Sequence, residues 1–223
     1  MAEIIITPDD LDCFDNYVET HPIALDLVYA DADHPENVFD TQIYKSDAKI
    51  WAHKDMLRLT LMAAENLYQK HKLILQIKDC LRVTEAQQKI IDTPIVQAHP
   101  EWITPPNTML ATAGQGGHPR GMAVDVALLT EDGDLVDMGT PFDFFPMDKN
   151  DVNPSARDFA HDARVMENRK ILDDAMMEAA ATCDLPLWPL PQEWWDFRFE
   201  PDYAYQYAPL SDDDLPAHMK MMP

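Results

Sequence analysis

Hydrophobic positions recur at helical spacing between residues 48 and 70. In "AKIWAHKDMLRLTLMAAENLYQK", Leu57, Leu61, Ala64 and Tyr68 follow one another at intervals of three or four residues. An α-helix makes one turn in about 3.6 residues, so this period places the four side chains on one face. The pattern predicts a long amphipathic helix that packs on the core.

A strand and a capped helix are predicted next. The short apolar run "LILQI" is typical of a strand. Thr84 and Gln87 have the spacing of a capping box, in which each side chain binds the backbone N–H of the other. They predict the start of a helix through "EAQQKIID", which has to end near Pro94 because the residue before a proline disfavours helical backbone.

Another helix is predicted to begin near Ser155 and Asp158, two residue types that favour helix N-termini. It is expected to reach Ala181, either unbroken or with one break. The residues expected on its buried face are Phe159, Ala163 and Met166.

Two strand candidates lie between these helices. The segments "MAVDVALL" and "LVDMG" are joined by "TEDGD", in which Asp132 and Gly133 form a strong hairpin turn signal. Helices grouped around antiparallel strands predict an α+β domain with a central antiparallel sheet flanked by helices.

Length and composition favour a single domain over residues 1–223. The chain is 46% hydrophobic, shows no internal repeat, and spreads its 18 prolines instead of gathering them in a linker. Residues 1–43 are expected to form an irregular N-terminal extension and residues 200–223 a C-terminal tail.

The charge balance limits the partners. Forty acidic and 17 basic residues give a net charge of −23, which repels nucleic-acid phosphates and anionic lipid headgroups. We therefore expect a small-molecule partner, with no nucleic acid and no membrane. The N-terminus lacks the basic and apolar regions of a signal peptide, and no window reaches the length of a membrane span, so a cytoplasmic location is expected.

The cysteines offer no disulfide framework or metal site. Cys13, Cys80 and Cys183 are far apart and odd in number, which fits reduced thiols. None has the spacing of a cysteine-ligated metal.

A histidine and an aspartate form the first candidate cluster. His118 lies in "GQGGHPRG", whose glycines permit close approach of the backbone, and Asp125 follows seven residues later in a predicted strand. An odd separation in an unbroken strand would point the two side chains to opposite faces, so the chain has to bend near Gly121 for them to meet. Alternatively, His118 is an ordinary surface or hydrogen-bonded residue of a turn.

The segment "EWWDFRFE" is the second candidate cluster. Glu193 and Asp196 are three positions apart, and Trp194 and Trp195 between them would exclude water and strengthen electrostatic interactions. The alternative is an edge strand with solvated acids and core tryptophans.

Four segments, taken in order, resemble the motifs of a known family. "KDCLRVTEAQ", "GGHPRGMAVDV", "VDMGTPFD" and "EWWDF" follow one another between about Tyr44 and Phe199. Together they resemble the zinc D-alanyl-D-alanine dipeptidases of the VanX type and their wider carboxypeptidase superfamily. The resemblance implies a Hedgehog-like α+β fold.

Two positions depart from the family patterns. The pattern S-x-H-x-x-G-x-A-x-D matches at His118 and Asp125 but has Gly116 in place of serine. The pattern E-x-W-H matches at Glu193 but has Asp196 in place of histidine.

The resemblance implies a role for each site residue. The implied metal ligands are His118, Asp125 and Asp196, and the implied catalytic residues are Glu193 as general base and Arg82 as the partner of the oxyanion. The implied substrate-binding residues are Asp143 for the substrate ammonium group, with Gly117 and Trp195. The family pattern around Arg82 is D-x-x-R-P, and Val83 stands here in place of the proline.

The implied cofactor is one divalent metal ion, which is zinc in this family. A histidine with two carboxylates is an oxygen-rich ligand set, which would also suit manganese or iron. Loss of the metal is the alternative, and His161 is a conceivable replacement ligand.

The implied activity is hydrolysis of D-Ala-D-Ala or a related small dipeptide by metal-activated water. Two alternatives stay open: a catalytically silent protein that binds peptides or muropeptides, and a cytosolic D,D- or L,D-carboxypeptidase.

Overall fold

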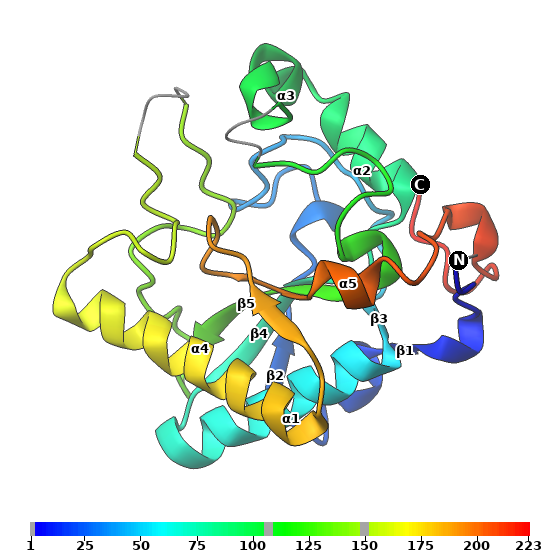
Figure 1. The fold of residues 1–223 in the computed structure, drawn as a ribbon. Helices are drawn as coiled ribbons and strands as arrows, with labels where there is room; N and C mark the ends of the chain where they lie inside the picture. Colours follow the sequence, from blue (N-terminus) through cyan, green and yellow to red (C-terminus); the bar gives the residue numbers. More distant parts are fainter. Residues whose placement is uncertain (1–2, 105–108, 148–151) are drawn as a thin grey trace.

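A five-stranded sheet lies at the centre of the protein, in strand order β2-β4-β5-β7-β6 (Figure 1). The structure is a computed structural model that describes residues 3–104, 109–147 and 152–223. The strands are β2 (Ile23–Leu25), β4 (Ile74–Asp79), β5 (Ala123–Leu129), β6 (Leu187–Pro189) and β7 (Asp196–Phe199). Strands β4, β5, β7 and β6 pair antiparallel, and β2 pairs parallel with β4 at one edge.

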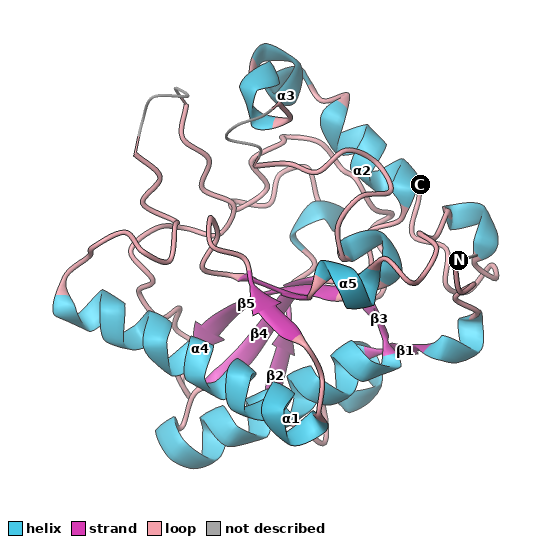
Figure 2. Cartoon of the chain, viewed as in Figure 1, coloured by secondary structure: helices cyan, strands magenta, loops and turns pink. Residues whose placement is uncertain are grey.

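Helices cover one face of the sheet, and other helices lie further from it (Figure 2). The long helices α1 (Lys54–His71) and α4 (Ala163–Cys183) lie side by side against one face, whereas α2 (Thr84–Ile91) and α3 (Pro94–Ala98) lie away from this pair. The predicted α+β class, with a central sheet and flanking helices, is confirmed. Among the described residues, no helix is both long enough and apolar enough to cross a membrane.

Helix α1 begins later than its periodicity predicts. Residues 48–53 were included in the predicted helix, but β3 (Trp51–His53) pairs antiparallel with β1 (Leu11–Cys13). His53 then caps the helix by accepting a hydrogen bond from the backbone N–H of Asp55. Pairing with a strand far away in sequence therefore outweighs local helical periodicity at this end.

Helix α2 forms where it was predicted, but its capping box does not. The side chain of Gln87 accepts a hydrogen bond from Arg82 and donates one to the carbonyl oxygen of Ala111. The amide is thereby committed to tertiary contacts, and Thr84 contacts Glu85 instead.

Helix α4 begins at residue 163, eight residues later than predicted. Asp162 is its N-cap and accepts hydrogen bonds from the backbone N–H groups of Arg164 and Val165. The buried face shifts accordingly, because Ala163 and Met166 are exposed while Val165 is buried. The rest of the buried face is Arg169, Leu172, Ala175, Met176, Ala179, Ala180 and Cys183.

The predicted strand over residues 135–139 does not form. The turn at Gly133 is present, with a φ of +88°, but beyond it only one isolated bridge joins Leu135 to Leu129. Arg169 of α4 binds the carbonyl oxygen of Met138, and Asn168 binds that of Asp137. These side chains occupy two successive carbonyl groups, of which a regular strand would have turned one toward β5.

Both chain ends contribute to the packed structure. The segment 1–43, predicted as an irregular extension, provides β1, β2 and the buried residue Tyr29. The segment 200–223 contains α5 (Pro201–Ala204) and the buried residues Met219 and Met221. The predicted tail therefore packs on the core.

Candidate active site

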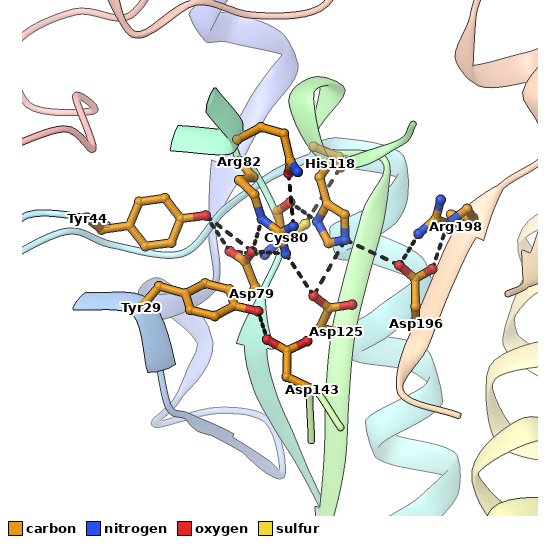
Figure 3. Close-up of polar contacts among 12 residues, drawn as sticks. Tyr29, Tyr44, Asp79, Cys80, Arg82, His118, Asp125, Asp143, Asp196 and Arg198 are labelled. Carbon is orange, nitrogen blue, oxygen red and sulfur yellow. Dashed lines mark hydrogen bonds and ion pairs between the residues drawn. The ribbon is translucent and has the colours of Figure 1, made fainter. Parts of the chain in front are cut away.

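Three aspartates lie in one row across the sheet. Asp79 on β4 is in register with Asp125 on β5, and Asp125 is in register with Asp196 on β7. All three are buried, with exposed fractions of 2% or less. Neighbouring buried carboxylates repel one another, so each requires a cationic or hydrogen-bonding partner (Figure 3).

His118 reaches this row through a tight turn. A short 3-10 helix, His118–Arg120, is followed by Gly121 with a φ of +62°. A β-carbon on Gly121 would lie 2.7 Å from the backbone nitrogen of His53, so only glycine fits there. The bend that the spacing of His118 and Asp125 requires is therefore present.

The imidazole of His118 lies between a carbonyl group and two carboxylates. Its Nδ1 is 2.7 Å from the carbonyl oxygen of Cys80, which leaves Nε2 facing Asp125 Oδ2 at 3.5 Å and Asp196 Oδ2 at 3.3 Å. Burial lowers the pKa of His118, but the charge of Asp125 and the hydrogen bonds outweigh it and raise the pKa to about 10. The surroundings of Nε2 thus favour a positive charge at this point.

Arg82 links two of the aspartates. Its Nε is 2.8 Å from Asp79 Oδ2, its Nη1 is 3.1 Å from Gln87 Oε1, and its Nη2 is 3.2 Å from Asp125 Oδ2. Asp79 also accepts a hydrogen bond of 2.9 Å from the hydroxyl of Tyr44. Arg82 is therefore held rigidly, with each nitrogen of its guanidinium group bound.

Asp143 lies at another side of the same cavity. It adopts a left-handed backbone with a φ of +54°, and its Oδ2 accepts a short hydrogen bond from the hydroxyl of Tyr29. Burial raises the pKa of Asp143 to about 7, although the Tyr29 hydrogen bond opposes this. The carboxyl group therefore changes charge near neutral pH.

Glu193 is buried at the edge of the cavity beside two tryptophans. Burial, with the nearby charge of Asp196, raises the pKa of Glu193 well above its usual value. Trp195 lines the cavity, and Trp194 donates a hydrogen bond of 2.9 Å to Thr140 Oγ1. Trp195 therefore forms part of the cavity wall, and the burial of Glu193 and Asp196 rules out the alternative of an edge strand with solvated acids.

Asp196 is held by Arg198, a residue that was missed from the sequence. Arg198 Nε is 2.7 Å from Asp196 Oδ1, and Arg198 Nη2 forms a short ion pair with Asp196 Oδ2. Burial opposes ionisation of Asp196, but the charge of Arg198 outweighs it and holds the pKa well below its usual value. A signal was present, because residues two apart in a strand point to the same face.

The functional side chains surround a cavity of about 170 Å³. The predicted site residues that line it are Arg82, His118, Asp125, Asp143, Glu193, Trp195 and Asp196. Gly117 is not among the lining residues, because it packs so tightly that a β-carbon would lie 2.7 Å from the carbonyl oxygen of Met122. Its neighbour Gly116 faces the cavity instead.

Tyr29 also lines the cavity and was missed, and His161 lies elsewhere. No local pattern in residues 1–43 indicates that the Tyr29 hydroxyl binds Asp143, which is 114 positions away. The ring of His161 lies 2.8 Å from the carbonyl oxygen of Pro154 and does not line the cavity. His161 is therefore not a replacement ligand.

The donor atoms in the cavity fit a divalent metal ion. Asp125 Oδ1 is buried and has no hydrogen-bond partner among the described residues, which is costly unless a cation binds it. Donors around a tetrahedral ion lie roughly 3.3 to 3.6 Å apart, given bond lengths of about 2.0 to 2.2 Å, and the distances from His118 Nε2 to the two carboxylates are of this size.

Each candidate ligand also has an outer hydrogen-bond partner. The carbonyl oxygen of Cys80 binds His118, Arg82 binds Asp125, and Arg198 binds Asp196. Such partners orient metal ligands in proteins. Donor atoms of Asp79, His118 and Asp125 also lie within 4.8 Å of one another, and the oxygens of Asp79 accept hydrogen bonds from Arg82 and Tyr44.

A second group of acidic side chains is already paired with a lysine. Donor atoms of Asp26, His34 and Glu36 lie within 4.8 Å of one another. The fully buried Lys78 places its Nζ 2.9 Å from Asp26 and 2.5 Å from Glu36. This group is therefore a partly buried ion-pair network around Lys78.

Comparisons with known proteins place the chain in a family. The profile of a family described as D-ala-D-ala dipeptidase matches residues 13–213. The D-alanyl-D-alanine dipeptidase of Escherichia coli (strain K12) is 29% identical over 190 residues, which cover 85% of this chain and 84% of the relative. The crystal structure of Serratia marcescens L-Ala D-Glu endopeptidase ChiX matches with a TM-score of 0.40 at 15% identity, over 69% of this chain and 84% of that chain.

Proposed function

The chain belongs to the D-ala-D-ala dipeptidase family of M15 peptidases, and on this basis we propose that it hydrolyses D-Ala-D-Ala or a closely related dipeptide with one divalent metal ion. The observation that carries the proposal is the convergence of His118, Asp125 and Asp196 in a buried cavity that also contains Glu193. A carboxylate of raised pKa beside a set of metal-binding donors is typical of metal-assisted hydrolysis.

The ion would be held by His118 Nε2 and by the carboxylates of Asp125 and Asp196. When bound, it supplies Lewis acidity to the scissile carbonyl group and to the attacking water molecule. Because two of the three side chains are carboxylates, the site should accept manganese or iron as well as zinc.

Glu193 is proposed to move the proton. A raised pKa makes its carboxylate a stronger base toward the attacking water, and the proton can then be returned to the leaving amine. The walls around it, including Trp195, keep the local dielectric low.

Arg82 is proposed to stabilise the negative charge that develops on the carbonyl oxygen. Its guanidinium group is already fixed by Asp79 and Gln87, so it does not need to reorganise during the reaction. Interactions that strengthen only in the transition state accelerate the chemical step.

Asp143 is proposed to bind the free ammonium group of the substrate, oriented by Tyr29. Because the pKa of Asp143 is about 7, its carboxylate form predominates above that pH and is lost below it. We expect the KM for D-Ala-D-Ala to rise about tenfold for each unit that the pH falls below 7, since the neutral acid no longer attracts the ammonium group.

The check is to measure initial rates between about pH 5.5 and 8.5 for wild type and Asp143→Asn. The variant should have a high KM that barely depends on pH over this range. A wild-type KM that stays constant from acidic to alkaline pH would rule out this role for Asp143.

Hydrolysis itself is tested with purified protein treated with a chelator and then reloaded with zinc, manganese or iron(II). We expect release of D-alanine from D-Ala-D-Ala only after reloading. The same ions should raise the melting temperature, because a ligand that binds the native state stabilises it. N-acetylated dipeptides should resist cleavage because they lack the ammonium group. No release with any of the ions would refute the proposed activity, and preferential cleavage of the N-acetylated substrate would favour a carboxypeptidase.

A binding protein without hydrolytic activity is the second candidate, and one observation favours it. Both oxygens of Asp196 are engaged by Arg198, which competes for the electron pairs that a metal ion needs. Stoichiometric binding of D-Ala-D-Ala in calorimetry, without release of D-alanine under any metal condition, would identify this function.

A further inference from the structure

We infer that Arg198 binds the terminal carboxylate of the dipeptide ligand through its Nη1. The inference rests on the proposed function for the class of ligand, a short peptide. It assigns to Arg198 a specificity role in addition to its contact with Asp196.

The position of Arg198 follows from the strand that carries it. Asp196 and Arg198 are two residues apart on β7, so both side chains point to the face that bears the row of aspartates. Arg198 lines the cavity, and its side chain retains an exposed fraction of 17%, whereas that of Asp196 is 1%. The guanidinium group is thus accessible from the cavity although its partner is not.

Arg198 also has hydrogen-bonding capacity to spare. Its Nε and Nη2 contact Asp196, while its Nη1 makes no hydrogen bond to any residue in the described part of the chain. Arg82, the other arginine that lines the cavity, has all three nitrogens bound to Asp79, Gln87 and Asp125. Of these two cations, Arg198 is the one with a free edge for an incoming anion.

The space in front of this edge is kept open by a glycine turn. A β-carbon on Gly116 would lie 3.6 Å from Arg198 Nη1, so the missing side chain leaves room beside the guanidinium group. Arg120 holds the turn by donating hydrogen bonds to the carbonyl oxygens of Gly114 and Gly116 at 3.0 Å and 2.9 Å. The gap is therefore part of a rigid structure.

The charges of the cavity are arranged to receive a zwitterion. In Figure 3, Asp143 and Arg198 lie on opposite sides of Asp125. A dipeptide with its ammonium group at Asp143 and its carboxylate at Arg198 would place its peptide bond between them, near the donors of the candidate metal site. A charge-assisted contact of arginine with carboxylate is stronger than a contact between neutral groups.

The test compares two ligands that differ only in this charge. Binding of D-Ala-D-Ala and of its C-terminal amide is measured by calorimetry with Glu193→Gln protein as purified, in which hydrolysis does not interfere. We expect the carboxylate form to bind about tenfold to a hundredfold more tightly than the amide, the range for a hydrogen bond to a charged group. Adding Arg198→Met should bring this ratio close to one, and Arg198→Lys should retain part of it.

The ratio of the two affinities distinguishes a direct contact between Arg198 and the ligand carboxylate from an indirect effect of Arg198 through Asp196. Arg157 provides the matched control, because its Nη2 donates a 2.9 Å hydrogen bond to the carbonyl oxygen of Asp196 while the residue does not line the cavity. Arg157→Met should change both affinities by a similar factor and leave the ratio intact.

Three results would overturn the inference: a ratio near one before Arg198 is changed, a ratio that survives Arg198→Met, or failure of both ligands to bind. Because the first needs no change at Arg198, it applies even if the Arg198 variants fold poorly. If the ratio behaves as expected but the wild-type protein never releases D-alanine, the hydrolytic function is refuted and the role of Arg198 is upheld.

Discussion

Replacing Glu193 by glutamine is expected to lower the turnover number for D-Ala-D-Ala by about 10²- to 10⁴-fold, the usual contribution of a general acid and base. The amide keeps the size of the side chain in its buried position but cannot accept a proton from water. Metal content and the circular dichroism spectrum should not change, because Glu193 is not among the proposed ligands. Turnover is measured at saturating substrate, together with metal analysis of the same samples.

Glu200→Gln is the matched control for this substitution. It makes the same chemical change at an exposed position that does not line the cavity, and it should keep wild-type turnover. A Glu193→Gln enzyme as fast as this control would remove Glu193 from the mechanism. Loss of metal from the Glu193 variant would instead indicate that the residue helps to hold the ion.

Replacing Arg82 by methionine should lower the free energy of unfolding by about 3–5 kcal/mol, the cost of removing one partner from a buried ion pair. Arg82 has an exposed fraction of 7% and compensates both Asp79 and Asp125, two buried carboxylates that would lose their shared cation. Urea unfolding at neutral pH with a chelator present measures this loss without a contribution from metal binding.

Arg164→Met serves as the control because Arg164 forms its ion pair with Asp137 at the surface, where the side chains are 73% and 51% exposed. Such pairs contribute about 0–1 kcal/mol. If Arg82→Met were no more destabilising than Arg164→Met, the row of aspartates would not depend on Arg82. An Arg82→Lys variant should recover part of the stability, since it restores the charge without the planar fork that binds Asp79 and Gln87 together.

The Asp196–Arg198 pair gives a physical reason for the departure from the family pattern at this position. Asp196 stands where the resemblance implies a histidine. Its negative charge lies near the buried carboxyl groups of Asp125 and Glu193 and repels their charges. Arg198 compensates this charge from the same strand face. The two residues therefore act as one unit, and changing either alone should disturb the site more than changing both.

The sequence by itself determined the elements whose signals are local. The period of apolar residues in α1 correctly identified Leu57, Leu61 and Ala64 as buried, with Tyr68 half-buried at the end of the helix. The positions of α2 and β5 were likewise encoded in neighbouring residues. Such signals reflect the backbone geometry of a few consecutive residues, which does not depend on the rest of the fold.

The sequence also determined most of the site, for a different reason. The order of its motifs identified residues from four separate segments that the structure brings to one cavity, among them Arg82, His118, Asp143 and Glu193. The bend at Gly121 could be anticipated because seven residues of strand cannot place His118 and Asp125 on one face. Here covalent geometry alone required a departure from regular structure.

Only the tertiary structure decided where several elements begin and which partners they choose. Residues 51–53 have helical periodicity but form β3, because β1 is available to pair with them. The carbonyl groups of Asp137 and Met138 bind α4 side chains and so leave no strand after the hairpin turn. In each case the free energy of a contact between distant segments exceeds the small local preference for one backbone conformation.

The same reason explains the two cavity residues that were missed. Tyr29 binds Asp143 across 114 positions of sequence, and nothing in its neighbourhood indicates that contact. Arg198 is two positions from Asp196 in the sequence, yet the space beside its Nη1 depends on the turn at Gly116, 82 positions earlier. Local sequence can place a side chain on a face of a strand, but the space and the charges in front of that face are set by whichever segments the fold brings there.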